Sequence, residues 1–136
     1  MSPAEMAALH ARVFTLPPPW SADAFAAILA QPGVTAVCEV GGFGLVRLIG
    51  EEAEILTLAV APEFRRQGLG RKLLSRMEAF AREGGAHKIF LEVAAGNAPA
   101  RTLYETSGYG SAGLRKGYFS GPSGGRDDAL VMVRHM

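Results

Sequence analysis

The hydrophobic positions at the start of the chain recur at helical spacing. Met6, Leu9 and Val13 fall three or four residues apart, which places them on one face of a helix. Ser2 opens a capping-box pattern at the start of this helix, and a run of prolines after residue 16 ends it. A second helix, with Ser21 as its N-cap, is predicted to follow and to stop at the next proline-glycine pair.

Strand patterns replace the helical spacing in the middle of the chain. Three β-rich runs are separated by short turns that contain glycine, and they cover residues 34–40, 43–49 and 53–60. Runs with such short links indicate an antiparallel meander. Helical spacing returns from Leu69 to Ala81, so the strand from Lys88 to Val93 is predicted to run parallel to the third run.

The last third of the chain contains shorter elements. Asn97 is predicted to cap a short helix. Two final strands are expected over residues 109–115 and 129–134, on either side of a glycine-rich loop at residues 117–125. The complete order predicts an α+β fold, with a mixed and mostly antiparallel central sheet flanked by helices. No linker or repeat divides the pattern, so residues 1–136 are expected to form a single domain.

Composition and charge narrow the possible functions. Fourteen Lys and Arg against thirteen Asp and Glu give a net charge of +1, from which we expect neither direct nucleic-acid binding nor membrane binding. No apolar run reaches the length of a membrane span and no signal-peptide pattern opens the chain, so a cytoplasmic location is expected. A single cysteine, Cys38, excludes an internal disulfide, and the histidines lack metal-ligand spacing, so no metal is expected.

The segment between residues 60 and 72 carries the clearest chemical signal. A strand ends, a loop with two glycines follows, and an amphipathic helix begins at once. Glycines let the backbone approach an anion closely, and the free N–H groups at a helix start favour negative charge. Four basic residues lie at the same place, namely Arg65, Arg66, Arg71 and Lys72. The segment matches neither a P-loop nor the dinucleotide fingerprint. It indicates a pyrophosphate site or, alternatively, a glycine turn into a basic surface helix.

The sequence Arg65-x-x-Gly68-x-Gly70, after an apolar strand and before a helix, resembles the Arg/Gln-x-x-Gly-x-Gly/Ala signature of the GNAT acetyltransferases. The resemblance implies acetyl-CoA as the co-substrate. Its pyrophosphate would lie on the loop, at Arg65, Arg66, Gln67, Gly68, Leu69, Gly70 and Arg71. Its pantetheine arm would pair with the preceding strand, at Leu58, Ala59 and Val60. That strand would splay from the strand at Lys88 to Val93 and open a site for the thioester. The family usually begins with a strand before the first helix, whereas this sequence opens with the helix, so either the first edge strand is missing or the chain is truncated.

Further residues narrow the resemblance. Leu91-Glu92-Val93, Leu103-Tyr104 and the tail from Arg115 to Ala129 are similar to the RimI-type ribosomal-protein alanine N-acetyltransferases, and the similarity covers nearly the whole chain. This implies a protein N-terminal peptide as the substrate, with alanine at its start and a ribosomal protein as its source. It also implies Glu92 as the general base, Tyr104 as the general acid and Asn97 as a further cofactor contact.

The chemistry of acetyl transfer is compatible with both catalytic roles. An α-amine has a pKa of about 7.7–8.0, against about 10.4 for lysine, so a glutamate acting through water is a sufficient base. Strand alternation places Glu92 on the opposite face from its two hydrophobic neighbours. A tyrosine with a pKa of about 10 is still protonated when a thiolate of pKa about 8.5 leaves. The alternatives are a solvated glutamate at position 92 and a core tyrosine at position 104.

Three aromatic residues are candidates for holding a peptide. Trp20, Tyr118 and Phe119 are predicted to line the substrate groove, and ordinary packing is the alternative explanation for them. Cys38 has no neighbour in the sequence that would activate it, which favours direct transfer in a ternary complex over an acyl-enzyme. The alternatives to N-terminal acetylation are acetylation of lysine side chains or of a small amine, and a CoA-binding module without activity.

Overall fold

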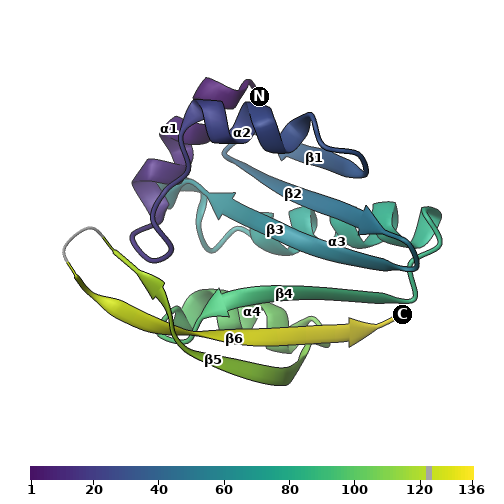
Figure 1. Ribbon diagram of the computed structural model, residues 1–136. Helices are drawn as coiled ribbons and strands as arrows, with labels where there is room; N and C mark the ends of the chain where they lie inside the picture. The colour runs from purple at the N-terminus through teal and green to yellow at the C-terminus, as the bar shows by residue number, and fades with distance from the viewer. Residues whose placement is uncertain (122–123) are drawn as a thin grey trace.

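The computed structural model describes residues 1–121 and 124–136. These residues form a six-stranded sheet with the order β1-β2-β3-β4-β6-β5 (Figure 1). Each neighbouring pair is antiparallel except β3 and β4, which are parallel. The strands are β1 Val34–Glu39, β2 Gly42–Ile49, β3 Glu52–Val60, β4 Lys88–Ala94, β5 Gly110–Ser120 and β6 Arg126–His135. The predicted α+β fold with a mixed, mostly antiparallel sheet is confirmed.

Helices cover both faces of this sheet. Two of them, α1 (Pro3–Val13) and α2 (Ala22–Leu29), pack on one face, and α3 (Leu69–Glu83) and α4 (Ala98–Thr106) pack on the other (Figure 1). The Ser2 hydroxyl accepts a hydrogen bond from the backbone N–H three residues later at 3.1 Å, as its capping-box pattern predicts. Within the described residues no strand precedes α1, as expected from the sequence.

The two faces of the sheet carry separate hydrophobic clusters. Beneath α1 and α2 the largest fully buried side chains are Met6, Phe25, Phe43 and Leu45. Beneath α3 and α4 the largest fully buried side chains are Val46, Leu73, Leu74, Met77, Ile89, Leu91 and Met132. Each large apolar side chain contributes roughly 1.5–3 kcal/mol by leaving water. The sheet is therefore held on both sides, and its strands are rigid supports for a site.

The parallel pair β3 and β4 separates partway along its length. Pairing runs only from Glu52↔Lys88 to Ile55↔Leu91, although both strands continue for several residues. β3 contains a bulge where its pairing with β4 ends. Leu45 of β2 pairs with Thr57, but the next residue of β2 pairs with Ile55, so one residue of β3 has no partner in β2. The bulge changes which side chains of β3 face α1. Beyond this point the edge of β3 that faces β4 has free backbone groups, and the predicted splay is present.

The final hairpin is longer than the sequence predicts. β5 continues to Ser120 and β6 begins at Arg126, so the first part of the glycine-rich loop predicted at residues 117–125, residues 117–120, belongs to β5. Its residues 122 and 123 lie outside the described part of the chain. The hairpin continues because Gly117, with φ of +58°, adopts the left-handed conformation within an irregularity between Arg115 and Phe119. The Asp128 carboxylate then accepts the Gly117 N–H at 2.7 Å.

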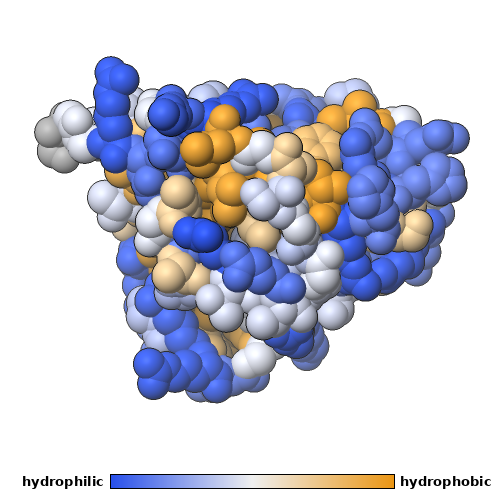
Figure 2. Space-filling view, turned by 90° about the horizontal axis from the view of Figure 1, so that it is seen from below, coloured by the Kyte–Doolittle hydropathy of each residue, from blue (hydrophilic) through white to orange (hydrophobic). Residues whose placement is uncertain are grey.

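The side of the molecule that carries β5 and β6 has a mixed surface. Seen from below the view of Figure 1, hydrophobic side chains gather in the middle of this side and hydrophilic ones surround them (Figure 2). Leu114 of β5 is 53% exposed, and β5 is itself an edge strand. Among the described residues, no helix is both long and apolar enough to cross a membrane.

Candidate active site

The glycine loop joins the end of β3 to the start of α3. A short 3-10 turn, Pro62–Phe64, leads into it, and Gly68 stands at the N-cap of α3. Gly68 has φ of +76°, a left-handed conformation that glycine adopts without strain. No side chain caps the helix start, and no acidic residue occupies the first turn. The first N–H groups of this 15-residue helix are therefore open to an anion.

A cavity of about 920 Å³ opens beside this helix start. Ten of the eleven predicted cofactor-binding residues line it, namely Leu58, Ala59, Val60, Arg65, Arg66, Gly68, Leu69, Gly70, Arg71 and Asn97. Gln67 does not line it, and its side-chain amide instead donates to the carbonyl of Glu63 at 3.4 Å. The volume and the mixture of apolar walls with a few polar groups are typical of a site for a large organic ligand.

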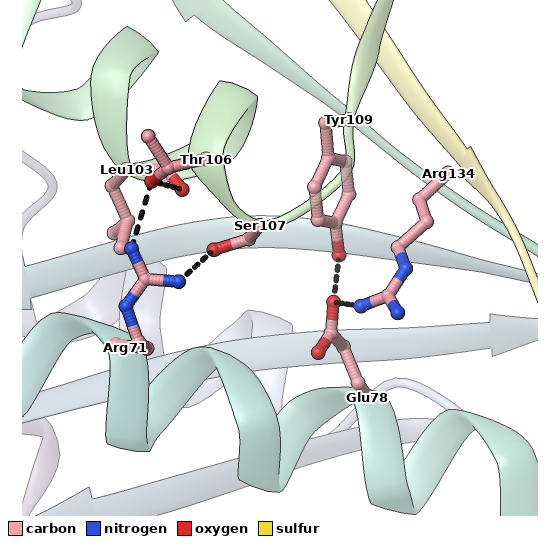
Figure 3. A network of polar contacts seen from close by, with 7 residues as sticks. All are labelled: Arg71, Glu78, Leu103, Thr106, Ser107, Tyr109 and Arg134. Atoms are coloured by element: carbon pink, nitrogen blue, oxygen red, sulfur yellow. Dashed lines mark hydrogen bonds and ion pairs between the residues drawn. The ribbon is translucent and has the colours of Figure 1, made fainter.

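The basic residues around the loop have different partners. Arg65 and Arg66 are exposed and form no ion pair with the described residues, so both are available to an anion. Lys72 is paired with Glu39 at 2.8 Å. The Arg71 guanidinium crosses to the end of α4, where it donates to Thr106 Oγ1 at 2.7 Å and to Ser107 Oγ at 3.1 Å (Figure 3). Arg65 and Arg66 are therefore the two basic side chains beside the loop that have neither an ion pair nor a hydrogen bond to the described residues.

A second cavity, of about 70 Å³, lies where β3 and β4 separate. Both predicted catalytic residues line it: Glu92 from β4 and Tyr104 from α4. The Glu92 side chain is 24% exposed, whereas its two neighbours in β4 are buried, as strand alternation predicts. Tyr104 and Asn97 line both cavities, so the small cavity adjoins the large one.

Tyr104 is buried among apolar side chains. Its ring packs edge-on against Tyr109, with 5.7 Å between the ring centroids. Burial raises the pKa of the Tyr104 hydroxyl above its ordinary value, which keeps it protonated at neutral pH. Asn97 caps α4 by accepting the N–H of Ala100 at 3.2 Å, and this cap holds the helix that carries Tyr104.

The three predicted peptide-binding aromatics lie in two places. Trp20 lines the small cavity, whereas Tyr118 and Phe119 lie on β5 and line neither cavity. Tyr118 is nevertheless connected to the site through Arg115. The Arg115 guanidinium carbon lies 5.0 Å from the centre of the Tyr118 ring, and its Nη2 lies 3.4 Å from Glu92 Oε1.

Sequence reasoning overlooked two polar residues of the small cavity. His10 of α1 is only 1% exposed, and its Nε2 lies 3.0 Å from the Oγ1 of Thr57 on β3. The available signal was a histidine on the apolar face of an amphipathic helix, which marks it as buried without naming its partner. Within residues 1–121 and 124–136, no group of three or more His, Cys, Asp or Glu is arranged to hold a metal ion.

Comparison with known proteins agrees with this architecture. Residues 6–109 match the family described as "Acetyltransferase (GNAT) family", and the chain belongs to this family. It is 34% identical, over 119 residues, to the ribosomal protein bS18-alanine N-acetyltransferase of Escherichia coli strain K12, an alignment that covers 85% of this chain and 80% of that protein.

Two solved structures extend the comparison. The crystal structure of the ribosomal-protein-S18-alanine N-acetyltransferase from Escherichia coli superposes with a TM-score of 0.82 at 31% identity, covering 98% of this chain and 86% of that one. The crystal structure of nourseothricin acetyltransferase superposes with a TM-score of 0.68 at 32% identity, covering 76% and 66%. The fold is therefore shared with family members whose names indicate very different acetyl acceptors.

Proposed function

We propose that this protein transfers the acetyl group of acetyl-CoA to the N-terminal α-amine of a protein, with alanine as the first residue and a ribosomal protein as the substrate. One observation carries the proposal. Glu92 and Tyr104 line a cavity at the separation of β3 and β4, and this cavity adjoins the large one beside the glycine loop. The similarity to the bS18-alanine N-acetyltransferase of Escherichia coli supports the choice of substrate. We place the reaction in the cytoplasm, where ribosomal proteins are made.

The residues of the large cavity fit acetyl-CoA along its length. The open helix start at Gly68, with Arg65 and Arg66 beside it, suits the pyrophosphate. The free edge of β3 from Leu58 to Val60 has unpaired backbone groups that suit the amides of the pantetheine arm. The acetyl group would then lie at the separation of the two strands, within reach of both cavities. The reactive end of the cofactor thus meets Glu92 and Tyr104.

Glu92 and Tyr104 handle the two protons of the reaction. Glu92 takes the amine proton through a bridging water, which leaves the nitrogen lone pair free to attack the acetyl carbon. The carbon–sulfur bond then breaks, the Tyr104 hydroxyl donates its proton to the departing thiolate, and Tyr104 recovers a proton from the acylated nitrogen, which must lose its second proton to become the amide. Burial raises the pKa of Tyr104, so its hydroxyl is protonated at neutral pH and can donate a hydrogen bond to the sulfur as negative charge develops there. Transfer is direct, within a ternary complex, and requires no metal.

Arg65 provides a test of the pyrophosphate site. Replacing Arg65 by Ala removes an exposed charge, and we expect the KM for acetyl-CoA to rise by about five- to tenfold with kcat nearly unchanged. Steady-state kinetics with varied acetyl-CoA measure this change. Arg82→Ala, at the exposed far end of α3, is the matched control and should leave the KM unaltered. An unchanged KM in Arg65→Ala would remove this residue from the cofactor site.

The acceptor is tested with two peptides and mass spectrometry. One peptide starts with a free alanine and contains no lysine, and the other is blocked at its N-terminus and contains one internal lysine. We expect acetylation of the first peptide alone. Acetylation of the second alone would reassign the enzyme to lysine side chains. If neither is modified while acetyl-CoA still binds, the N-terminal function is refuted.

A small-molecule amine is the second candidate acceptor. It is favoured by the 32% identity to nourseothricin acetyltransferase over 76% of this chain. An aminoglycoside-sized or streptothricin-type amine, offered in competition with the alanine peptide, distinguishes the two. A higher kcat/KM for the small amine would make it the preferred class. No turnover of any amine, with intact acetyl-CoA binding, would indicate a CoA-binding module without activity.

A further inference from the structure

A chain of hydrogen bonds connects the loop between α1 and α2 to the site where β3 and β4 separate. The backbone N–H of Trp20 donates to His10 Nδ1 at 3.0 Å. On the other side of the same ring, Nε2 lies 3.0 Å from Thr57 Oγ1. All three residues line the small cavity that Glu92 also lines. The catalytic roles assigned to Glu92 and Tyr104 do not explain why a buried histidine and threonine stand there.

The direction of these hydrogen bonds follows from the donors. A backbone N–H can only donate, so Nδ1 of His10 is the acceptor of the Trp20 N–H. Burial lowers the pKa of His10 to about 4, so the ring is neutral at pH 7 and its single proton is on Nε2. Nε2–H therefore donates to Thr57 Oγ1. The Thr57 hydroxyl still has its own proton to donate, and within the described part of the chain it has no other hydrogen-bond partner.

Thr57 and Glu92 face the small cavity from the same side of the sheet. The bulge in β3 turns Thr57 toward α1, and Glu92 faces away from the α3 side, so both side chains lie on the same side of the sheet. They approach the small cavity from the two separating strands. A cavity of about 70 Å³ with polar groups on opposite walls meets the requirements for holding an ordered water.

We propose that Thr57, oriented by His10, is a positioning residue whose hydroxyl donates a hydrogen bond to the water through which Glu92 takes the proton of the substrate amine. This inference rests on the proposed acetyltransferase function and on the role of Glu92 in it. One lone pair of the water oxygen accepts the Thr57 hydroxyl, and the other faces the amine. One hydrogen of the water points to the Glu92 carboxylate.

The proton transfer balances without any change in Thr57. The N–H bond of the amine breaks as its proton passes to the water oxygen, and one O–H bond of the water breaks as its proton passes to Glu92. The water is regenerated, Glu92 becomes neutral, and Thr57 and His10 keep their own protons. Trp20 lies at the start of the same chain of hydrogen bonds. The loop between α1 and α2 therefore helps, through His10 and Thr57, to hold the water in position for Glu92.

The test compares Thr57→Val with Thr57→Ser. Valine has the shape of threonine without the hydroxyl, and serine keeps the hydroxyl. For the amine that the wild-type protein acetylates, we expect Thr57→Val to lower kcat by about 10- to 100-fold at pH 7, with the KM for acetyl-CoA within twofold of wild type. Thr57→Ser should recover kcat to within about threefold. Thr35→Val, a half-buried threonine on β1, is the control and should retain full activity.

The pH dependence separates positioning from a merely structural effect. The titratable and charged groups around the water are His10 from α1, Glu92 from β4, Tyr104 from α4 and Arg115 from β5. Between pH 6.5 and 9, His10 stays neutral and Tyr104 stays protonated. The α-amine, with a pKa of about 7.7–8.0, loses its proton to solvent in this range. The deficit of Thr57→Val should therefore shrink toward pH 9, whereas a packing defect would be equal at every pH.

The results of these experiments distinguish the role of Thr57 from the proposed acetyltransferase function. A wild-type kcat in Thr57→Val, a Thr57→Ser variant as impaired as Thr57→Val, or a deficit independent of pH would overturn the role of Thr57 and leave the proposed function standing. A wild-type protein that acetylates no amine would overturn both. Circular dichroism and acetyl-CoA binding at the assay temperature verify that each variant is folded.

Discussion

Replacing Glu92 by Gln is expected to lower kcat for the alanine peptide by about 10²–10⁴-fold, the range that general base catalysis contributes. Glutamine has nearly the shape of glutamate and cannot take a proton from the bridging water. The side chain is 24% exposed and lies away from the cofactor loop, so the affinity for acetyl-CoA should be unchanged. Stopped assays of peptide acetylation, with calorimetry of acetyl-CoA binding, measure both quantities.

Two further variants serve as a control and as a comparison for Glu92→Gln. Glu83→Gln, on the exposed end of α3, makes the same chemical change far from the site and should retain wild-type kcat. Tyr104→Phe removes only a hydroxyl and should reduce kcat less than Glu92→Gln does, because a thiolate can leave without full protonation. If Glu92→Gln keeps more than half of the wild-type kcat, the assignment of Glu92 as the base is wrong.

Arg134→Ala is expected to lower the free energy of unfolding by about 3 kcal/mol, because it leaves a buried carboxylate without its cation. Glu78 is 5% exposed, and one of its oxygens accepts both the Arg134 guanidinium and the Tyr109 hydroxyl, each at 2.8 Å (Figure 3). The Arg134 side chain is 32% exposed, which favours the lower end of the range for breaking a buried ion pair. Urea denaturation followed by circular dichroism measures the change.

The control for this prediction is an exposed ion pair. Arg12 pairs with Glu63 at 2.6 Å, but both side chains are more than half exposed and the pair is screened by solvent, so Arg12→Ala should lower the free energy of unfolding far less than Arg134→Ala does. Adding Glu78→Gln to Arg134→Ala should restore part of the lost stability, because the unpaired charge is then gone. A loss in Arg134→Ala no larger than that in Arg12→Ala would contradict the account of this network.

Local signals explain why much of the fold was predictable. The Ser2 and Ser21 caps depend on residues three positions away, and both are present as predicted. Alternation along β4 correctly placed Glu92 opposite its buried neighbours, because strand geometry alone decides the face. The glycine loop could also be predicted, because the residues that identify it lie within six consecutive positions, 65–70.

The features that escaped prediction depend on residues far apart in the chain. His10 meets Thr57 across 47 positions, and no periodicity reports such a contact. The bulge that turns Thr57 toward α1 belongs to the pairing of β3 with β2 and not to either strand alone. The extension of the last hairpin likewise depends on Asp128 accepting the N–H of Gly117 eleven residues earlier. Glycines in a loop and glycines in an irregular strand look the same in sequence.

Arg71 ties the helix that begins at the glycine loop to the helix that carries Tyr104. Its guanidinium spans from the first turn of α3 to the last residues of α4, so the two helices are joined beside the large cavity. The distance between the proposed pyrophosphate site and the Tyr104 hydroxyl is thereby built into the scaffold. If acetyl-CoA binds as proposed, its two ends contact helices that Arg71 holds together, so replacing Arg71 should disturb the binding of the phosphates and the placement of the thioester at the same time.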